Sequence, residues 1–111
     1  MLQKEAVVPE MIDLIKELQS NSLFIEYSLV GGTALALQLG HRTSTDIDLF
    51  TPKTQDTVAL IGFFRNNYNN INIDIANNTF IRIFVNNIKI EMVWYDEKII
   101  DSPKIEENIK F

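Results

Sequence analysis

Two acidic residues, Asp46 and Asp48, stand one residue apart in a short apolar run that continues to Phe50. Successive side chains of a β-strand point to opposite faces, so both carboxylates would share one face while Ile47 and Leu49 share the other. Like charges held this close repel each other, and such a pair persists only with a shared proton, a lysine or arginine, or a divalent cation. Because the ligands would be hard oxygen atoms, the preferred cation is magnesium.

A pair of glycines precedes the carboxylates in the chain. Gly31 and Gly32 are followed by Thr33 and by residues 34–39, which are rich in alanine and leucine and favour a helix that ends at Gly40. A glycine turn before a helix lets backbone N–H groups approach an anion at the positive end of that helix. A nucleoside triphosphate with two magnesium ions would satisfy both features, with its phosphates on the turn and the metals on the aspartates. The alternative is an ordinary tight turn followed by a solvated strand face.

Three polar residues lie between the glycines and the aspartates. Arg42 offers a forked donor for a phosphate group, and it would equally serve to balance the charge of the two aspartates. Ser44 would either donate to a phosphate oxygen or cap the turn. His41 is the only histidine of the chain, and one histidine makes no zinc site without other suitable ligands nearby. The stretch matches neither a Walker phosphate loop, which needs a lysine after the glycines, nor the acidic loop of an EF-hand.

Taken together, the runs Gly31–Leu35 and His41–Phe50 resemble the nucleotidyltransferase superfamily. More closely, they are similar to the AbiEii/AbiGii toxin family of abortive-infection and toxin–antitoxin systems. This resemblance implies transfer of a nucleotide from a nucleoside triphosphate to an RNA such as tRNA or to a protein hydroxyl, with a cognate antitoxin as a partner. The residues expected to bind the nucleotide are Gly31, Gly32, Thr33, Arg42 and Ser44.

A third carboxylate is expected to complete the metal site. Nucleotidyltransferases commonly take this residue from a later strand, and Glu91, in the alternating run Ile88–Trp94, stands at the matching place. Together with Asp46 and Asp48, Glu91 would bind magnesium or help to deprotonate the attacking hydroxyl. The catalytic and metal-binding prediction therefore consists of these three carboxylates.

A competing interpretation makes Glu91 a solvent-facing residue paired across a hairpin with Arg82 or Lys89. If Glu91 pointed away from the two aspartates, Asp74 would become the candidate third carboxylate. The asparagines that cluster in residues 68–78 are assigned no chemistry, since asparagine suits turns and solvent-facing strand positions.

Composition limits the class of protein. A chain of 111 residues with 46% hydrophobic residues fits one globular domain. The chain has no cysteine, and we find neither a signal peptide nor an apolar run long enough to span a membrane, so we expect a soluble, cytoplasmic protein. The net charge of −5 argues against broad, charge-driven nucleic-acid binding but does not exclude a nucleic-acid substrate.

The hydrophobic pattern predicts helices over residues 9–19 and 55–68 and an apolar stretch over residues 23–30 that ends in a strand before the glycines. Alternation predicts strands over residues 71–75, 79–85 and 88–94, the last two joined by the two-residue turn Asn86-Asn87. Ser102-Pro103 is typical of a helix start. The predicted fold is α+β: a mixed, mostly antiparallel sheet of about four or five strands with helices packed against it, the minimal nucleotidyltransferase core.

Two other functions remain open at this stage. Members of the resembled family generally continue into a helical second half that helps to bind substrate, and this sequence, read as one core domain over residues 1–111, has no such half. The chain could therefore be a non-catalytic binding module that keeps the fold. It could also be a small antitoxin-type nucleotidyltransferase that modifies a partner toxin.

Overall fold

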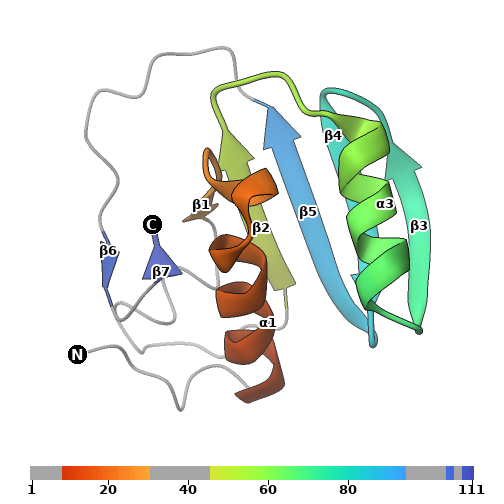
Figure 1. The fold of residues 1–111 in the computed structure, drawn as a ribbon, viewed down its shortest axis with the longest axis horizontal. Coiled ribbons are helices and arrows are strands. Elements are labelled where there is room, and N and C mark those ends of the chain that lie inside the picture. Colours follow the sequence, from red (N-terminus) through yellow and green to blue (C-terminus); the bar gives the residue numbers. More distant parts are fainter. Residues whose placement is uncertain (1–8, 31–45, 95–104, 107–108) are drawn as a thin grey trace.

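The computed structural model describes residues 9–30, 46–94, 105–106 and 109–111. Its centre is a five-stranded sheet in the order β1-β2-β5-β4-β3 (Figure 1). The bounds of these strands are β1 Ser28–Val30, β2 Asp46–Thr51, β3 Ile71–Ala76, β4 Phe80–Val85 and β5 Ile88–Trp94.

The sheet is mixed and mostly antiparallel, as predicted. β2 and β5 form a parallel pair at its centre, while the pairs β1/β2, β3/β4 and β4/β5 are antiparallel. A parallel pair needs a crossover connection, and the chain makes it through the helix α3 (Thr57–Asn67) and the strands β3 and β4. The parallel pair brings two segments that are far apart in the sequence into direct contact.

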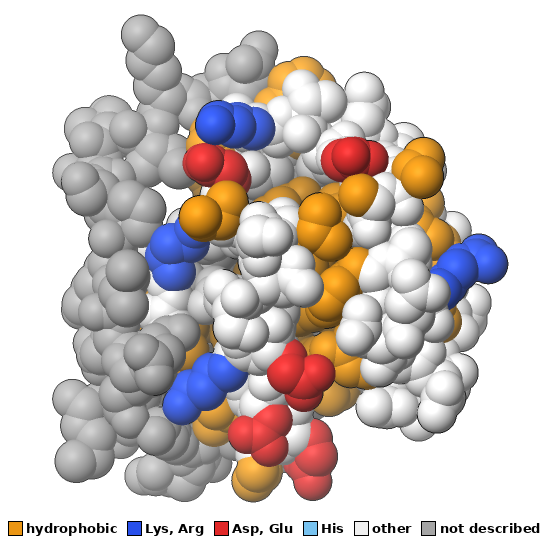
Figure 2. Space-filling model, viewed as in Figure 1, with side chains coloured by type: hydrophobic (Ala, Val, Ile, Leu, Met, Phe, Trp, Pro, Cys, Tyr) orange, Lys and Arg blue, Asp and Glu red, His pale blue; other side chains and the backbone are white. Residues whose placement is uncertain are grey.

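Two helices, α1 (Pro9–Ser20) and α3, lie over one face of the sheet (Figure 1). Seen from this side, hydrophobic side chains appear mainly near the middle of the surface, and charged side chains lie mostly around them (Figure 2). In β2 every second residue is buried, so Ile47 and Leu49 join the core beneath the helices while Asp46 and Asp48 face the other way. No helix in the described ranges is long and apolar enough to span a membrane.

The predicted hairpin turn between β4 and β5 is confirmed. Asn86 and Asn87 have positive φ angles of 50° and 68°, the conformation that a two-residue turn of this kind requires and that asparagine tolerates. The backbone N–H of Asn86 also donates to the carbonyl of Asn70 at 2.9 Å. This bond joins the turn to the segment that precedes β3.

The apolar stretch over residues 23–30 ends in a strand, as predicted, and its first part is helical. A short 3-10 helix, η2 (Ser22–Phe24), occupies its start, and the Asn21 side chain caps it by accepting a hydrogen bond from the Leu23 N–H. Only β1 is extended. The reason is local, because an asparagine side chain that bonds the backbone two residues ahead favours a turn over a strand.

The prediction of a helix after Ser102-Pro103 is wrong for the part of this segment that the structure describes. β6 (Ile105–Glu106) and β7 (Ile109–Lys110) form an antiparallel pair instead. The Gln19 side-chain amide donates to the carbonyl of Lys110 at 2.9 Å and accepts from its N–H at 2.8 Å, and Ile109 is completely buried. Tertiary contacts with α1 thus override the local helix signal. The predicted helix over residues 34–39 lies outside the described residues.

Candidate active site

The side of the sheet turned away from the helices, which we name the carboxylate face, is built from rows of side chains. Residues paired in register on neighbouring strands point to the same side, so each row crosses the sheet. The first row contains Asp46, Lys89, Phe84 and Asn72, the second Val30, Asp48, Glu91 and Arg82, and the third Ser28, Phe50, Val93 and Phe80. The ionisable side chains occupy the first two rows, and the third is largely apolar.

The three predicted carboxylates come together on this face. Asp48 and Glu91 are direct register partners on the parallel strands β2 and β5, and Asp46 lies two residues before Asp48 on the same side. The charge of the Glu91 side chain acts on Asp48, and both residues are half-buried. The position of Glu91 follows from the strand order, because a parallel register aligns two acidic residues that are 43 positions apart.

The electrostatics of Asp48 reflect this crowding. Burial raises the pKa of its carboxyl above the ordinary value, and the charge and hydrogen bond of Glu91 and the charge of Asp46 raise this pKa further. The Lys89 ammonium acts in the opposite direction and lowers it. Ionising Asp48 in this environment is therefore costly unless positive charge is supplied.

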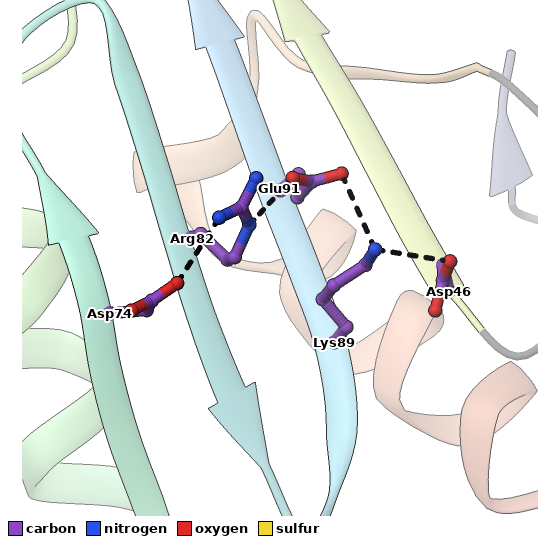
Figure 3. A network of polar contacts seen from close by, with 5 residues as sticks. All are labelled: Asp46, Asp74, Arg82, Lys89 and Glu91. Atoms are coloured by element: carbon purple, nitrogen blue, oxygen red, sulfur yellow. Dashed lines mark hydrogen bonds and ion pairs between the residues drawn. The ribbon is translucent and has the colours of Figure 1, made fainter.

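Two basic residues supply part of that charge (Figure 3). The Lys89 Nζ lies 3.4 Å from an Asp46 oxygen and 3.9 Å from a Glu91 oxygen. The Arg82 guanidinium donates from Nε to Glu91 at 2.8 Å and from Nη1 to Asp74 at 3.1 Å. Charges of opposite sign thus alternate from β3 to β2 across the sheet.

These contacts reconcile the two interpretations of Glu91. The residue is paired with Arg82 and Lys89, as the competing interpretation held, and it also shares a face with the two aspartates. Asp74 is separated from the carboxylate cluster by Arg82, at a register irregularity of β3. The reserve candidate is therefore not part of the cluster.

The sequence interpretation did not place Arg82 and Lys89 in the site, although a signal was available. A two-residue turn at Asn86-Asn87 sets the register of the hairpin, so residue 82 must lie opposite residue 91 and residue 84 opposite residue 89. Arg82 and Lys89 were considered only as alternatives to a metal-binding role of Glu91, whereas this register places both on the same face as the carboxylates.

The donor chemistry of the cluster fits magnesium. Carboxylate oxygens are the ligands this ion prefers, and Asp48 and Glu91 are register partners with Asp46 on the same face. Within the described ranges, however, no three acidic or histidine side chains already converge as a metal site. The basic partners hold the carboxylates in the present arrangement.

The predicted nucleotide-binding residues Gly31, Gly32, Thr33, Arg42 and Ser44 lie outside the described residues. The ends of their segment are placed, since Val30 is the register partner of Asp48 and the chain returns at Asp46. The roles of these five residues remain predictions.

A mixed sheet with helices on one side and acidic side chains on the other is consistent with a minimal nucleotidyltransferase fold. The chain belongs to the AbiEii nucleotidyl transferase toxin family of type IV toxin–antitoxin systems, whose pattern it matches over residues 13–109. No curated protein matches the sequence significantly.

Two solved structures share the fold. JHP933 from Helicobacter pylori is 21% identical with a TM-score of 0.60, over 90% of this chain and 47% of that protein. A proposed nucleotidyltransferase from H. pylori is also 21% identical with a TM-score of 0.60, and the match covers 97% of this chain and 51% of that protein. The present chain thus spans about half the length of these proteins.

Proposed function

We propose that this chain is the core of a metal-dependent nucleotidyltransferase that transfers a nucleotide from a nucleoside triphosphate to the hydroxyl of an RNA, such as tRNA, or of a protein. The observation that carries the proposal is the register of Asp48 with Glu91 on parallel strands, with Asp46 on the same face. Metal-assisted transfer needs a cluster of hard oxygen ligands on a rigid support, and central strands supply that support.

Asp46 and Asp48 would hold two magnesium ions. Glu91 would bind metal or accept the proton of the attacking hydroxyl. Bound magnesium would neutralise the phosphate charge that develops during transfer. Lys89, now between Asp46 and Glu91, would turn from these carboxylates toward the phosphates of the donor. Arg82, held by Asp74, would keep Glu91 in place.

The donor phosphates would bind at the segment that connects Val30 to Asp46. The backbone N–H groups of Gly31, Gly32 and Thr33 would contact the phosphates, and Arg42 and Ser44 would add side-chain donors. Since β1 ends opposite Asp48, a triphosphate bound by the first residues of this segment would lie beside the carboxylates. A cognate antitoxin is the expected protein partner, as in type IV systems.

Incubation with each labelled nucleoside triphosphate, magnesium and total cellular RNA or protein tests the proposal. We expect label on an acceptor with the wild type and at least a 100-fold lower rate with Asp48→Ala, because the metal loses a ligand. Asp13→Ala, which removes an exposed carboxylate of α1, is the matched control and should retain the wild-type rate. Equal labelling by the wild type and Asp48→Ala would contradict the proposal.

A non-catalytic binding module is the second candidate. It is favoured by the ion pairs of Arg82 and Lys89, which already offset the acidic cluster without metal. Calorimetry distinguishes the two functions: a folded protein that binds no magnesium nucleotide at millimolar concentration is the module, whereas magnesium-dependent binding indicates the transferase.

A further inference from the structure

A hollow of about 450 Å³ lies at the edge of the sheet near the β4/β5 turn and is lined by Asn70, Asn72, Phe84 and Asn87. Its volume falls within the range of small-molecule sites. Phe84 is half-buried and the three asparagines are exposed. The lining therefore combines one aromatic ring with several amides and carries no charge.

The walls of this hollow are positioned by backbone contacts. Asn72 and Phe84 are register partners on β3 and β4, so both side chains lie on the carboxylate face. Asn87 belongs to the turn with positive φ angles, and the bond from the Asn86 N–H to the Asn70 carbonyl holds the other rim against that turn. These contacts fix the backbone from which the side chains of the hollow project.

The lining has the chemistry that recognises a nucleobase. A phenylalanine ring provides a stacking surface for any base. Each asparagine amide carries both donors and an acceptor, which match the mixed donor and acceptor edges of the bases. An uncharged planar heterocycle with polar edges satisfies both groups at once.

The hollow also lies close to the proposed transfer site. Phe84 is the register partner of Lys89, and Lys89 is the partner of Asp46, so the ring lies two strands from that aspartate. At about 4.8 Å between neighbouring strands, this separation is roughly 10 Å. A nucleotide whose phosphate or hydroxyl lies at the carboxylates can place its base at this distance.

A second hollow of about 340 Å³ is lined by Arg65, Ile71, Asn72 and Ile73 and shares Asn72 with the first. Arg65 is exposed and presents a guanidinium, which suits a phosphate group. This second hollow lies on the helix side of the β3 edge, because Ile71 and Ile73 alternate with Asn72 and pack against the core. A single strand that crosses this edge would place a phosphate at Arg65 and a base at Phe84.

We infer that the hollow formed by Asn70, Asn72, Phe84 and Asn87 is a nucleobase subsite of the transfer reaction. The inference rests on the proposed function, because the base belongs either to the donor triphosphate or to an acceptor strand. Phe84 stacks on the base and the asparagine amides bind its edge.

The test measures affinity by titration of the isotope-labelled protein followed by NMR, with magnesium present for the triphosphate, whose binding is expected to depend on the metal, and with EDTA for the trinucleotide. The probes are a nucleoside triphosphate and an unphosphorylated ribotrinucleotide, each with the four bases in turn. Phe84→Leu keeps the apolar volume without the aromatic face, and Asn72→Ala removes an exposed amide. Asn66→Ala on α3, outside both hollows, is the matched control. Circular dichroism melts confirm that each variant folds.

We expect Phe84→Leu and Asn72→Ala to weaken binding of at least one probe by about tenfold, and Asn66→Ala to have no effect. Weakening confined to the trinucleotide assigns the subsite to the acceptor, and weakening confined to the triphosphate assigns it to the donor. Unchanged affinity of the folded variants, or no binding of either probe to the wild type at millimolar concentration, overturns the inference. Because no transfer is measured, loss of base binding in the variants supports the subsite even if nucleotidyl transfer is never detected.

Discussion

At the residue scale, the fold places Asp48 in a half-buried position beside two other carboxylates, Asp46 and Glu91. Its neighbours Ile47 and Leu49 are buried in the core, so the backbone of β2 cannot move to relieve the repulsion between Asp48 and Glu91. A carboxyl held in this way keeps its proton to a higher pH than it would in an unfolded chain. A cost in stability at this position is typical of residues retained for function.

Asp48→Asn is predicted to stabilise the protein at neutral pH. The raised pKa means that the folded state binds more protons than the unfolded state above the ordinary aspartate pKa, so the free energy of unfolding falls as pH rises through that window. Asparagine removes this loss of stability, so the melting temperature of the variant should exceed that of the wild type by about 2 °C at pH 7 and by almost nothing at pH 3. The increase is modest because the carboxyl is partly solvated.

Thermal melts from pH 3 to pH 7 measure this effect. Asp13→Asn, which replaces an exposed carboxylate on α1, controls for the general loss of negative charge. An increase in melting temperature of Asp48→Asn that is equally large at pH 3 would show that ionisation of Asp48 does not destabilise the fold.

At the element scale, the β4/β5 hairpin decides which side chains meet. Its two-residue turn pairs Arg82 with Glu91 and Phe84 with Lys89, and thereby builds both the ion-pair network and one wall of the hollow. A slip of one residue would move every side chain of β5 to the opposite face and place Glu91 in the core. The conformation of the turn is thus a condition for the site.

Asn87→Val is predicted to destabilise the protein by about 1–3 kcal/mol, because a β-branched residue is strained at a φ of 68°. Asn87→Gly is the matched control: it also removes the amide, but it tolerates positive φ and should remain within about 0.5 kcal/mol of the wild type. Urea unfolding curves of the two variants measure the difference. Equal destabilisation by valine and glycine would assign the effect to the lost amide.

At the scale of the whole molecule, the sheet has one face covered by helices and one face that carries the charged rows. The core beneath the helices includes buried residues from α1, α3 and the central strands. The carboxylate face therefore bears charged groups without placing them in that core. The solved proteins that share this fold are about twice as long as the matched region.

This chain by itself is predicted to bind a nucleoside triphosphate weakly with magnesium and to transfer the nucleotide poorly. The metals and the glycine turn would hold the donor, whereas an acceptor needs further surface of the kind that another domain supplies. Calorimetric titration with and without magnesium measures the first part, and the labelled-acceptor assay measures the second. Rapid transfer to RNA by this chain would show that its own surface is sufficient for the acceptor.

The sequence by itself determined the local elements and the candidate groups. Helical spacing predicted α1 and α3, alternation predicted β3, β4 and β5, and Asn86-Asn87 predicted the turn, because each signal depends on residues within a few positions of one another. The carboxylates Asp46 and Asp48 were assigned to one face for the same reason. Only the tertiary structure decided that β2 and β5 pair in parallel, which places Glu91 beside Asp48 and Lys89 beside Asp46. It also decided that β6 and β7 pair as strands, with Lys110 bonded to Gln19 of α1 and Ile109 buried, since these contacts link positions far apart in the chain and outweigh a local preference.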